Sequence, residues 1–69
     1  MTSIGKICAK YRREQGYRLS DIAKDTGTTP ANICHFEHDR NDSRDIFLWY
    51  ILHGLTAEYL VQNGGGHSE

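Results

Sequence analysis

Residues 27 to 40, GTTPANICHFEHDR, bring together side chains that can read a DNA base pair. If this stretch is helical, a turn of 100° per residue places Ala31, His35 and His38 on one side, flanked by Asn32. Asparagine can pair bidentately with adenine, and alanine can contact the methyl group of thymine. A histidine N–H can donate to a guanine acceptor. We therefore expect Ala31, Asn32, His35 and His38 to read bases.

The residues around this stretch supply only a few groups for phosphate. Thr28 and Thr29, together with the N–H groups at a helix start, can hold a phosphate oxygen. The full set of expected phosphate contacts is Arg18, Thr28, Thr29, Arg40, Asn41, Arg44, Lys10 and Arg13. Affinity falls with salt by a slope of about −0.9 per neutralised phosphate, so few contacts predict weak binding by a monomer and stronger binding by a dimer.

Other chemistry is poorly supported. Cys34 and His38 are four residues apart, with His35 between them, which is an arrangement that can hold a metal. There is no second ligand cluster in the sequence, so we expect neither a metal nor another cofactor. No set of nucleophile, base and orienting acid is recognisable, and a chain this small has little room for a pocket. We expect no enzymatic activity and no small-molecule substrate.

Turn and capping signals indicate the elements that must position these residues. Thr29 can cap a helix, and Pro30 suits its first position because proline has no N–H to leave unpaired. Gly16, Gly27 and Gly54 can end helices. The predicted helices span residues 3–15, 19–26, 29–38 and 44–53, with a short fifth helix after Thr56.

Apolar spacing predicts which faces of these helices are buried. Ile4, Ile7, Cys8 and Tyr11 repeat at the i, i+3, i+4, i+7 spacing of one helical face. Leu19, Ile22 and Ala23 should face inward from the second helix, and Ile33 and Phe36 from the third. With no alternating strand pattern, the chain is predicted to be a compact all-α domain of five helices.

Composition indicates a small globular protein. The 69 residues are 38% hydrophobic and 25% charged, which suits one domain over residues 1–63 with a flexible tail at 64–69. The apolar run at residues 46–52 is too short to cross a bilayer, and no signal peptide is recognisable, so we expect a cytoplasmic protein without a membrane partner. Cys8 and Cys34 should stay reduced there.

The charges are unevenly distributed although the net charge is only −1. Basic side chains are in excess over residues 1–20, and acidic ones over residues 21–45. A chain near neutrality does not bind nucleic acid by bulk electrostatics alone. Phosphate contacts should therefore depend on the N-terminal third.

Two segments, RREQGYRLSDIAKDTGTTPANICHFEHDR and WYILHGLTAEYLVQNG, carry a family resemblance. Together they resemble the phage-repressor and Cro type (Xre-like) helix-turn-helix family over about residues 4 to 63. That family has a glycine before the second helix, an alanine in its middle, a glycine in the turn, and an isoleucine and a glutamate in the recognition helix. Gly16, Ala23, Gly27, Ile33 and Glu37 stand at those places.

The resemblance implies a lambda-repressor-like fold and a function. It implies a sequence-specific transcriptional regulator, a repressor or Cro-like protein, that binds double-stranded DNA in a bacterial or phage-infected cell. It also implies a partly buried salt bridge between Arg12 and Glu37. The alternative is that these are two ordinary surface charges.

The fourth helix is the expected site of dimerisation. Its residues 46–52, IFLWYIL, are apolar all round, whereas a helix on a small core needs only one apolar stripe. Aligned on Gly54, the family's inward positions are Ile46, Phe47, Trp49, Tyr50 and His53. Leu48, Ile51 and Leu52 then lie on the opposite side and can form a two-fold homodimer contact. The alternative is that the fifth helix and Tyr59 cover them.

A different function also fits these features. A domain of near-zero charge with an apolar fourth helix can be a protein-binding module that binds another regulator or a polymerase subunit through that helix. Replacing Asn32 and His35 should abolish a DNA function and spare a protein one. Charges at Leu48 and Ile51 should instead damage a protein-binding function most directly.

Overall fold

Helix α1 begins where a serine caps it. In the computed structural model, which describes residues 3–63, α1 spans Ile4–Gln15, and Ser3 Oγ accepts a hydrogen bond from the Lys6 N–H at 3.2 Å. Gly16 ends the helix in the left-handed conformation with φ 79°, a region that other residues enter only with strain. The tail predicted at residues 64–69 lies outside the described residues.

The next two helices follow the capping signals closely. Helix α2 spans Leu19–Thr26 and ends at Gly27, which has φ 71°. Helix α3 spans Pro30–Glu37, with Pro30 in its first turn and Thr29 as its N-cap. The Thr29 hydroxyl accepts the Asn32 N–H at 3.2 Å, so one donor at the helix start is satisfied by the cap.

Two further helices complete the chain. Helix α4 spans Arg44–Leu52, and the Ser43 hydroxyl accepts the Ile46 N–H at 3.4 Å. Helix α5 spans Ala57–Asn63 and is capped by Thr56, whose hydroxyl accepts the Tyr59 N–H at 3.1 Å. None of the helices within residues 3–63 has the length and apolar character needed to cross a membrane.

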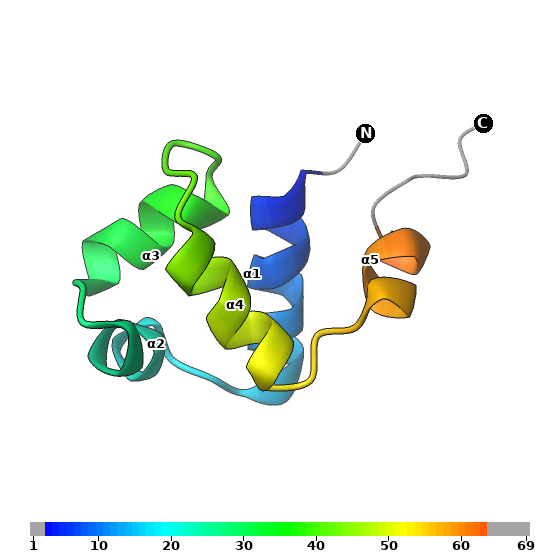
Figure 1. Cartoon of the computed structure of the whole chain (residues 1–69), viewed down its shortest axis with the longest axis horizontal. Helices are drawn as coiled ribbons and strands as arrows, with labels where there is room; N and C mark the ends of the chain where they lie inside the picture. The colour runs from blue at the N-terminus through cyan, green and yellow to red at the C-terminus, as the bar shows by residue number, and fades with distance from the viewer. Residues whose placement is uncertain (1–2, 64–69) are drawn as a thin grey trace.

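The five helices form one packed body with a central pair. Figure 1 shows α1 and α4 in the middle, α2 and α3 on one side of them, and α5 on the other. The radius of gyration is 11.5 Å, and residues 3–63 contain no strand. The prediction of a small all-α domain of five helices is confirmed.

The core is built from every helix except α5. Its fully buried side chains are Cys8, Ile22, Ile33, Ile46, Tyr50 and Leu55. Phe36 and Trp49 lie at its edges, and the Phe36 ring stacks on that of Tyr50 with centroids 6.4 Å apart. Cys8 faces this core, as its place in the α1 pattern predicts.

Ile4 is not part of the buried face of α1, contrary to the prediction. Its side chain is 47% exposed in the first turn of the helix, whereas Gly5 beside it is buried. A Cβ on Gly5 would overlap the carbonyl oxygen of Phe36. Glycine therefore lets α1 approach the end of α3, and Gly5 instead of Ile4 occupies the buried side in this turn.

His53 is also exposed, although the family alignment places it inward. It is the C-cap of α4, and its ring stacks on the Trp49 indole with centroids 3.8 Å apart and an interplanar angle of 16°. Leu55, just after Gly54, fills the interior instead and is only 2% exposed. The chain reverses at Gly54, which has φ 107°.

Helix α5 packs on α1 and not on the outer side of α4. The Tyr59 ring meets the Tyr11 ring edge to face at 5.3 Å, and the Tyr59 hydroxyl donates to Glu14 Oε1 at 2.7 Å. Leu48, Ile51 and Leu52 on α4 stay exposed at 46%, 38% and 81%. The alternative in which the fifth helix covers Leu48, Ile51 and Leu52 is therefore wrong.

Candidate nucleic-acid interface

The exposed side of α3 carries the predicted base-reading residues. Ile33 is fully buried and Phe36 is 5% exposed, so these two side chains fix the rotation of the helix against the core. Ala31, Asn32, His35 and His38 are all exposed, and Cys34 between them is half-buried. The structure brings the four predicted residues together on one solvent-facing surface, which we call the α3 face.

A buried ion pair holds the far end of α3 in place. Arg12 Nε donates to Glu37 Oε2 at 2.6 Å, and the Tyr50 hydroxyl donates to the same oxygen at 3.1 Å. Glu37 is 6% exposed, so its carboxylate lies in an almost dry site and depends on these partners. The hydrogen bond to Glu37 raises the pKa of Arg12, while burial raises the pKa of Tyr50 above its ordinary value.

Polar side chains at the start of α3 are linked to each other. The Asn32 amide donates from Nδ2 to Thr28 Oγ1 at 2.6 Å, while the Asn32 backbone N–H is bound to Thr29. An amide has two N–H donors and one acceptor oxygen. The Thr28 bond therefore uses one donor and leaves the other N–H and the amide oxygen of this exposed side chain for a ligand. This link is not among the contacts predicted from the sequence, although a threonine four residues before an asparagine is a usable signal.

The other end of the α3 face is a shallow depression of about 310 Å³. It is lined by Cys34, His35, His38 and Arg40. His38 Nδ1 lies 2.8 Å from the Cys34 carbonyl oxygen and 3.6 Å from its Sγ, so the imidazole folds back on its own helix. Residues 3–63 contain no group of three or more side chains placed to hold a metal ion. The His35 imidazole and the Arg40 guanidinium at this end of α3 can bind an anion.

The predicted phosphate contacts are dispersed over the molecule. Thr28 and Thr29 lie at the start of α3, and Arg40 and Asn41 follow its end. Arg18 is the exposed N-cap of α2, where its backbone N–H donates to Asp21 Oδ2 at 3.1 Å. These residues from α2 and both ends of α3 are the ones that can flank a ligand bound on the α3 face.

Two of the predicted phosphate contacts, Lys10 and Arg13, lie on α1 in different surroundings. Lys10 Nζ donates to Asn63 Oδ1 on α5 at 2.5 Å, whereas α1 meets α3 through Gly5 and Arg12. The helical rotation between Gly5 and Lys10 is about 140°, and Figure 1 shows α3 and α5 on opposite sides of α1. The structure therefore separates Lys10 from the α3 face. Arg13 is exposed in the last turn of α1.

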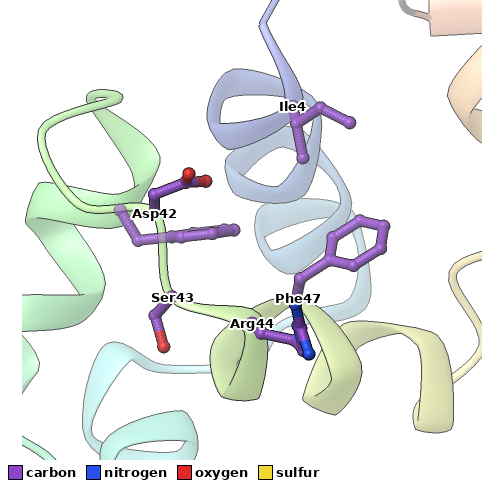
Figure 2. Close-up of a pocket in the computed structure, with 6 residues that line it drawn as sticks. Ile4, Asp42, Ser43, Arg44 and Phe47 are labelled. Atoms are coloured by element: carbon purple, nitrogen blue, oxygen red, sulfur yellow. The ribbon is translucent and has the colours of Figure 1, made fainter.

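Arg44 lies at a different feature, a pocket of about 310 Å³ between the starts of α1 and α4. Figure 2 shows Arg44 and Phe47 on α4, Ile4 on α1, and Asp42 and Ser43 in the preceding loop. Phe36 of α3 completes the apolar lining, and Asp42 contributes a carboxylate. Arg44 thus lines a pocket that also contains a carboxylate.

The outer side of α4 exposes the three predicted apolar residues. Leu48 is 46% exposed, Ile51 38% and Leu52 81%, while Ile46, Trp49 and Tyr50 on the other side are buried. Phe47 is half-buried rather than fully inward. Leu48, Ile51 and Leu52 form the α4 patch, a second surface distinct from the α3 face.

No protein-family model matches the chain, and no solved structure matches it either. The resemblance to phage-repressor and Cro proteins therefore stays a prediction. The class that fold and surface define is a small five-helix domain with one polar exposed helix face and one apolar exposed patch.

Proposed function

We propose that this protein is a sequence-specific regulator of transcription that reads the major groove of double-stranded DNA with α3. The observation that carries the proposal is the α3 face, where Ala31, Asn32 and His35 share one exposed surface on a helix anchored by Ile33 and Glu37. A rigid support of this kind allows side chains to recognise base edges without first being ordered.

The size of α3 fits a major groove. The major groove is about 12 Å wide and admits an α-helix, whose diameter with side chains is about 10–12 Å. The eight residues of α3 make a rod about 12 Å long, enough to present two turns of side chains. Asn32 lies in the first turn, where a helix that enters the groove by its N-terminus meets base edges. His35 follows one turn later on the same side.

The sparse positive charge around α3 supports a dimeric mode of binding. Arg18 directly precedes α2, and Arg40 follows α3 by three residues. Acidic residues lie close to both in the sequence, Asp21 near Arg18 and Asp39 near Arg40. One subunit can neutralise only a few phosphates, so two subunits on one duplex gain much more affinity than one.

The α4 patch supports a homodimer with two-fold symmetry. Three exposed apolar side chains on one helix are typical of a protein interface. A two-fold contact presents two α3 helices to half-sites about one DNA turn apart, which predicts an operator with two-fold symmetry. Three side chains are few beside the roughly 800 Å² per partner of a stable complex, so we expect DNA to strengthen the dimer.

A protein-binding module is the second candidate, and the exposure of the α4 patch favours it. In that function the patch binds another regulator or a polymerase subunit, and α3 has no nucleic-acid role. The Asn32→Ala and His35→Ala variants then retain activity, while Leu48→Glu and Ile51→Glu lose it.

Selection of bound fragments from a random pool of duplex DNA tests the proposal. The wild-type protein should enrich a short consensus with two-fold symmetry, and Asn32→Ala should not enrich the same consensus. Gln62→Ala is the matched control, because it removes an exposed amide from α5 instead of α3. If the wild-type protein enriches no sequence, the proposal is rejected and the protein-binding module takes its place.

A further inference from the structure

A groove of about 260 Å³ lies between α2 and α4, beside the α4 patch. It is lined by Asp25, Thr26, Asp45, Leu48, Trp49 and Leu52. Trp49 forms a buried part of the lining, and its Nε1–H donates to Asp25 Oδ2 at 2.9 Å. Leu48 and Leu52 are the exposed apolar side chains. The groove therefore combines apolar side chains from α4 with a carboxylate from each helix.

The charges of the groove are all of one sign. Asp25 belongs to α2 and Asp45 to the first turn of α4, and no lysine or arginine is among the lining residues. Asp21, one turn before Asp25, is also exposed and extends the acidic edge of α2. A second copy of this chain, packed through its own leucines, brings two more carboxylates and no cation from this groove.

An amphipathic helix with basic flanks has the complementary chemistry. Apolar residues at i, i+3, i+4 and i+7 can cover Leu48 and Leu52, which is how helices bind in apolar grooves. Lysine or arginine on either side of that stripe then meets Asp25 and Asp45. Complementary charges at the rim select the partner and orient it.

We infer that the groove between α2 and α4 binds a cationic amphipathic helix of a second protein, and that this partner excludes self-association through the α4 patch. Both contacts cover Leu48 and Leu52, so one molecule cannot make both at once. The α3 face stays exposed in either state. The partner lowers DNA affinity by leaving a monomer with few phosphate contacts, and this consequence alone rests on the proposed function.

The full chain and a fluorescein-labelled synthetic peptide test the binding. The peptide is a helix of about four turns with leucine at i, i+3, i+4 and i+7 and lysine at the flanking positions. Its control is the same peptide with every lysine replaced by glutamate. Fluorescence anisotropy should show at least about tenfold tighter binding of the lysine peptide. Backbone amide shifts in NMR spectra should change in α2 and α4.

Charge reversal in the chain provides the matched variants. Asp45→Lys should weaken the lysine peptide at least about tenfold and improve binding of the glutamate peptide. Asp42→Lys makes the same charge change in the loop outside the groove and should leave both affinities unchanged. Asp45→Asn is the milder variant if Asp45→Lys does not fold, and it should weaken the lysine peptide. Equal affinity for the two peptides, an unaffected Asp45 variant, or shifts centred on α3 or α5 overturns the inference.

Sedimentation and DNA binding separate this inference from the proposed function. At a protein concentration at which sedimentation detects the dimer, saturating lysine peptide should convert it to a peptide-bound monomer. If the peptide binds and the dimer persists, mutual exclusion is wrong. If the peptide binds and the protein enriches no DNA sequence, the proposed function fails and the groove assignment stands. If the protein enriches a DNA sequence and the peptide does not bind, only the groove assignment fails.

Discussion

Arg12 Nε lies 2.6 Å from Glu37 Oε2, and this ion pair joins α1 to the last residue of α3. Glu37 also accepts the Tyr50 hydroxyl, so three helices meet at one carboxylate. A charge this deeply buried is stable only while its partners remain. The pair therefore determines how firmly α3 is held in the position from which it presents Asn32 and His35.

Removing Arg12 should destabilise the fold more than removing both charges. Arg12→Met strands the Glu37 carboxylate and should cost about 3 to 5 kcal/mol. Arg12→Met combined with Glu37→Met leaves no buried charge and should lose less than the single variant. Urea unfolding followed by circular dichroism measures both. The single variant Glu37→Met completes the comparison. If the double variant loses as much stability as Arg12→Met and Glu37→Met together, the two residues act independently.

Gly5→Ala should be destabilising although alanine is the better helix former. The added Cβ overlaps the Phe36 carbonyl oxygen, and such overpacking costs about 1 to 3 kcal/mol, more than the gain in helix propensity of about 1 kcal/mol. Gly16→Ala is the control for backbone strain, because φ is 79° there and its Cβ would meet nothing within 4 Å. We expect Gly5→Ala to shift α3 and weaken DNA binding, and Gly16→Ala to change stability alone. Thermal unfolding and DNA affinity report the two effects, and a stabilising Gly5→Ala would contradict the close approach of α1 and α3.

Stability should fall at alkaline pH because of Cys8. Burial raises the pKa of its thiol from 9.0 to about 12. The unfolded chain loses this proton at a lower pH than the folded protein, so the contribution is intact below pH 9.0 and declines as pH rises toward about 12. Urea unfolding between about pH 8 and 10 should show this decline, and Cys8→Ala should reduce it even if it lowers stability at every pH. The remaining decline comes from tyrosines whose pKa burial also raises, such as Tyr50. An identical pH dependence in both proteins would exclude Cys8 as its source.

The salt dependence of DNA binding should show that Arg40 contacts a phosphate and that Lys10 does not. Each phosphate contact contributes about 0.9 to the slope of log affinity against log salt. Arg40 lines the depression at the end of the α3 face, so Arg40→Gln should reduce the slope by about that amount for each subunit. Lys10 is bound to Asn63 on α5, and Lys10→Gln should leave the slope unchanged. The reverse pattern would mean that DNA contacts α1 instead of the end of α3.

The helices could be predicted well because their ends depend on local signals. Ser3, Thr29 and Ser43 each cap a helix through a bond three residues along the chain, and Gly16 and Gly27 each take a left-handed φ. These features require only neighbouring residues. The exposure of Leu48 and Leu52 could also be predicted, since an all-apolar helix cannot bury every side on a small core.

Contacts between distant residues account for what could not be predicted. A glycine inside a helix normally only weakens it, whereas Gly5 in the fold leaves room for the Phe36 carbonyl oxygen at the end of α3. The Ile4 side chain is exposed in the same turn of α1. His53 is exposed because Leu55, beyond the turn at Gly54, takes the interior position. The separation of Lys10 from α3 depends on where α5 packs, and no spacing in the sequence specifies it.

Recognition of an adenine by Asn32 is tested most directly by changing the side chain and the base together. In the enriched site, each adenine that Asn32 can reach is replaced in turn, and binding of wild-type, Asn32→Ala and Gln62→Ala proteins is measured at one salt concentration. At one position the replacement should cost the wild type and Gln62→Ala about 1 to 3 kcal/mol and cost Asn32→Ala almost nothing. Equal losses for all three proteins at every position would mean that Asn32 does not read bases from the α3 face.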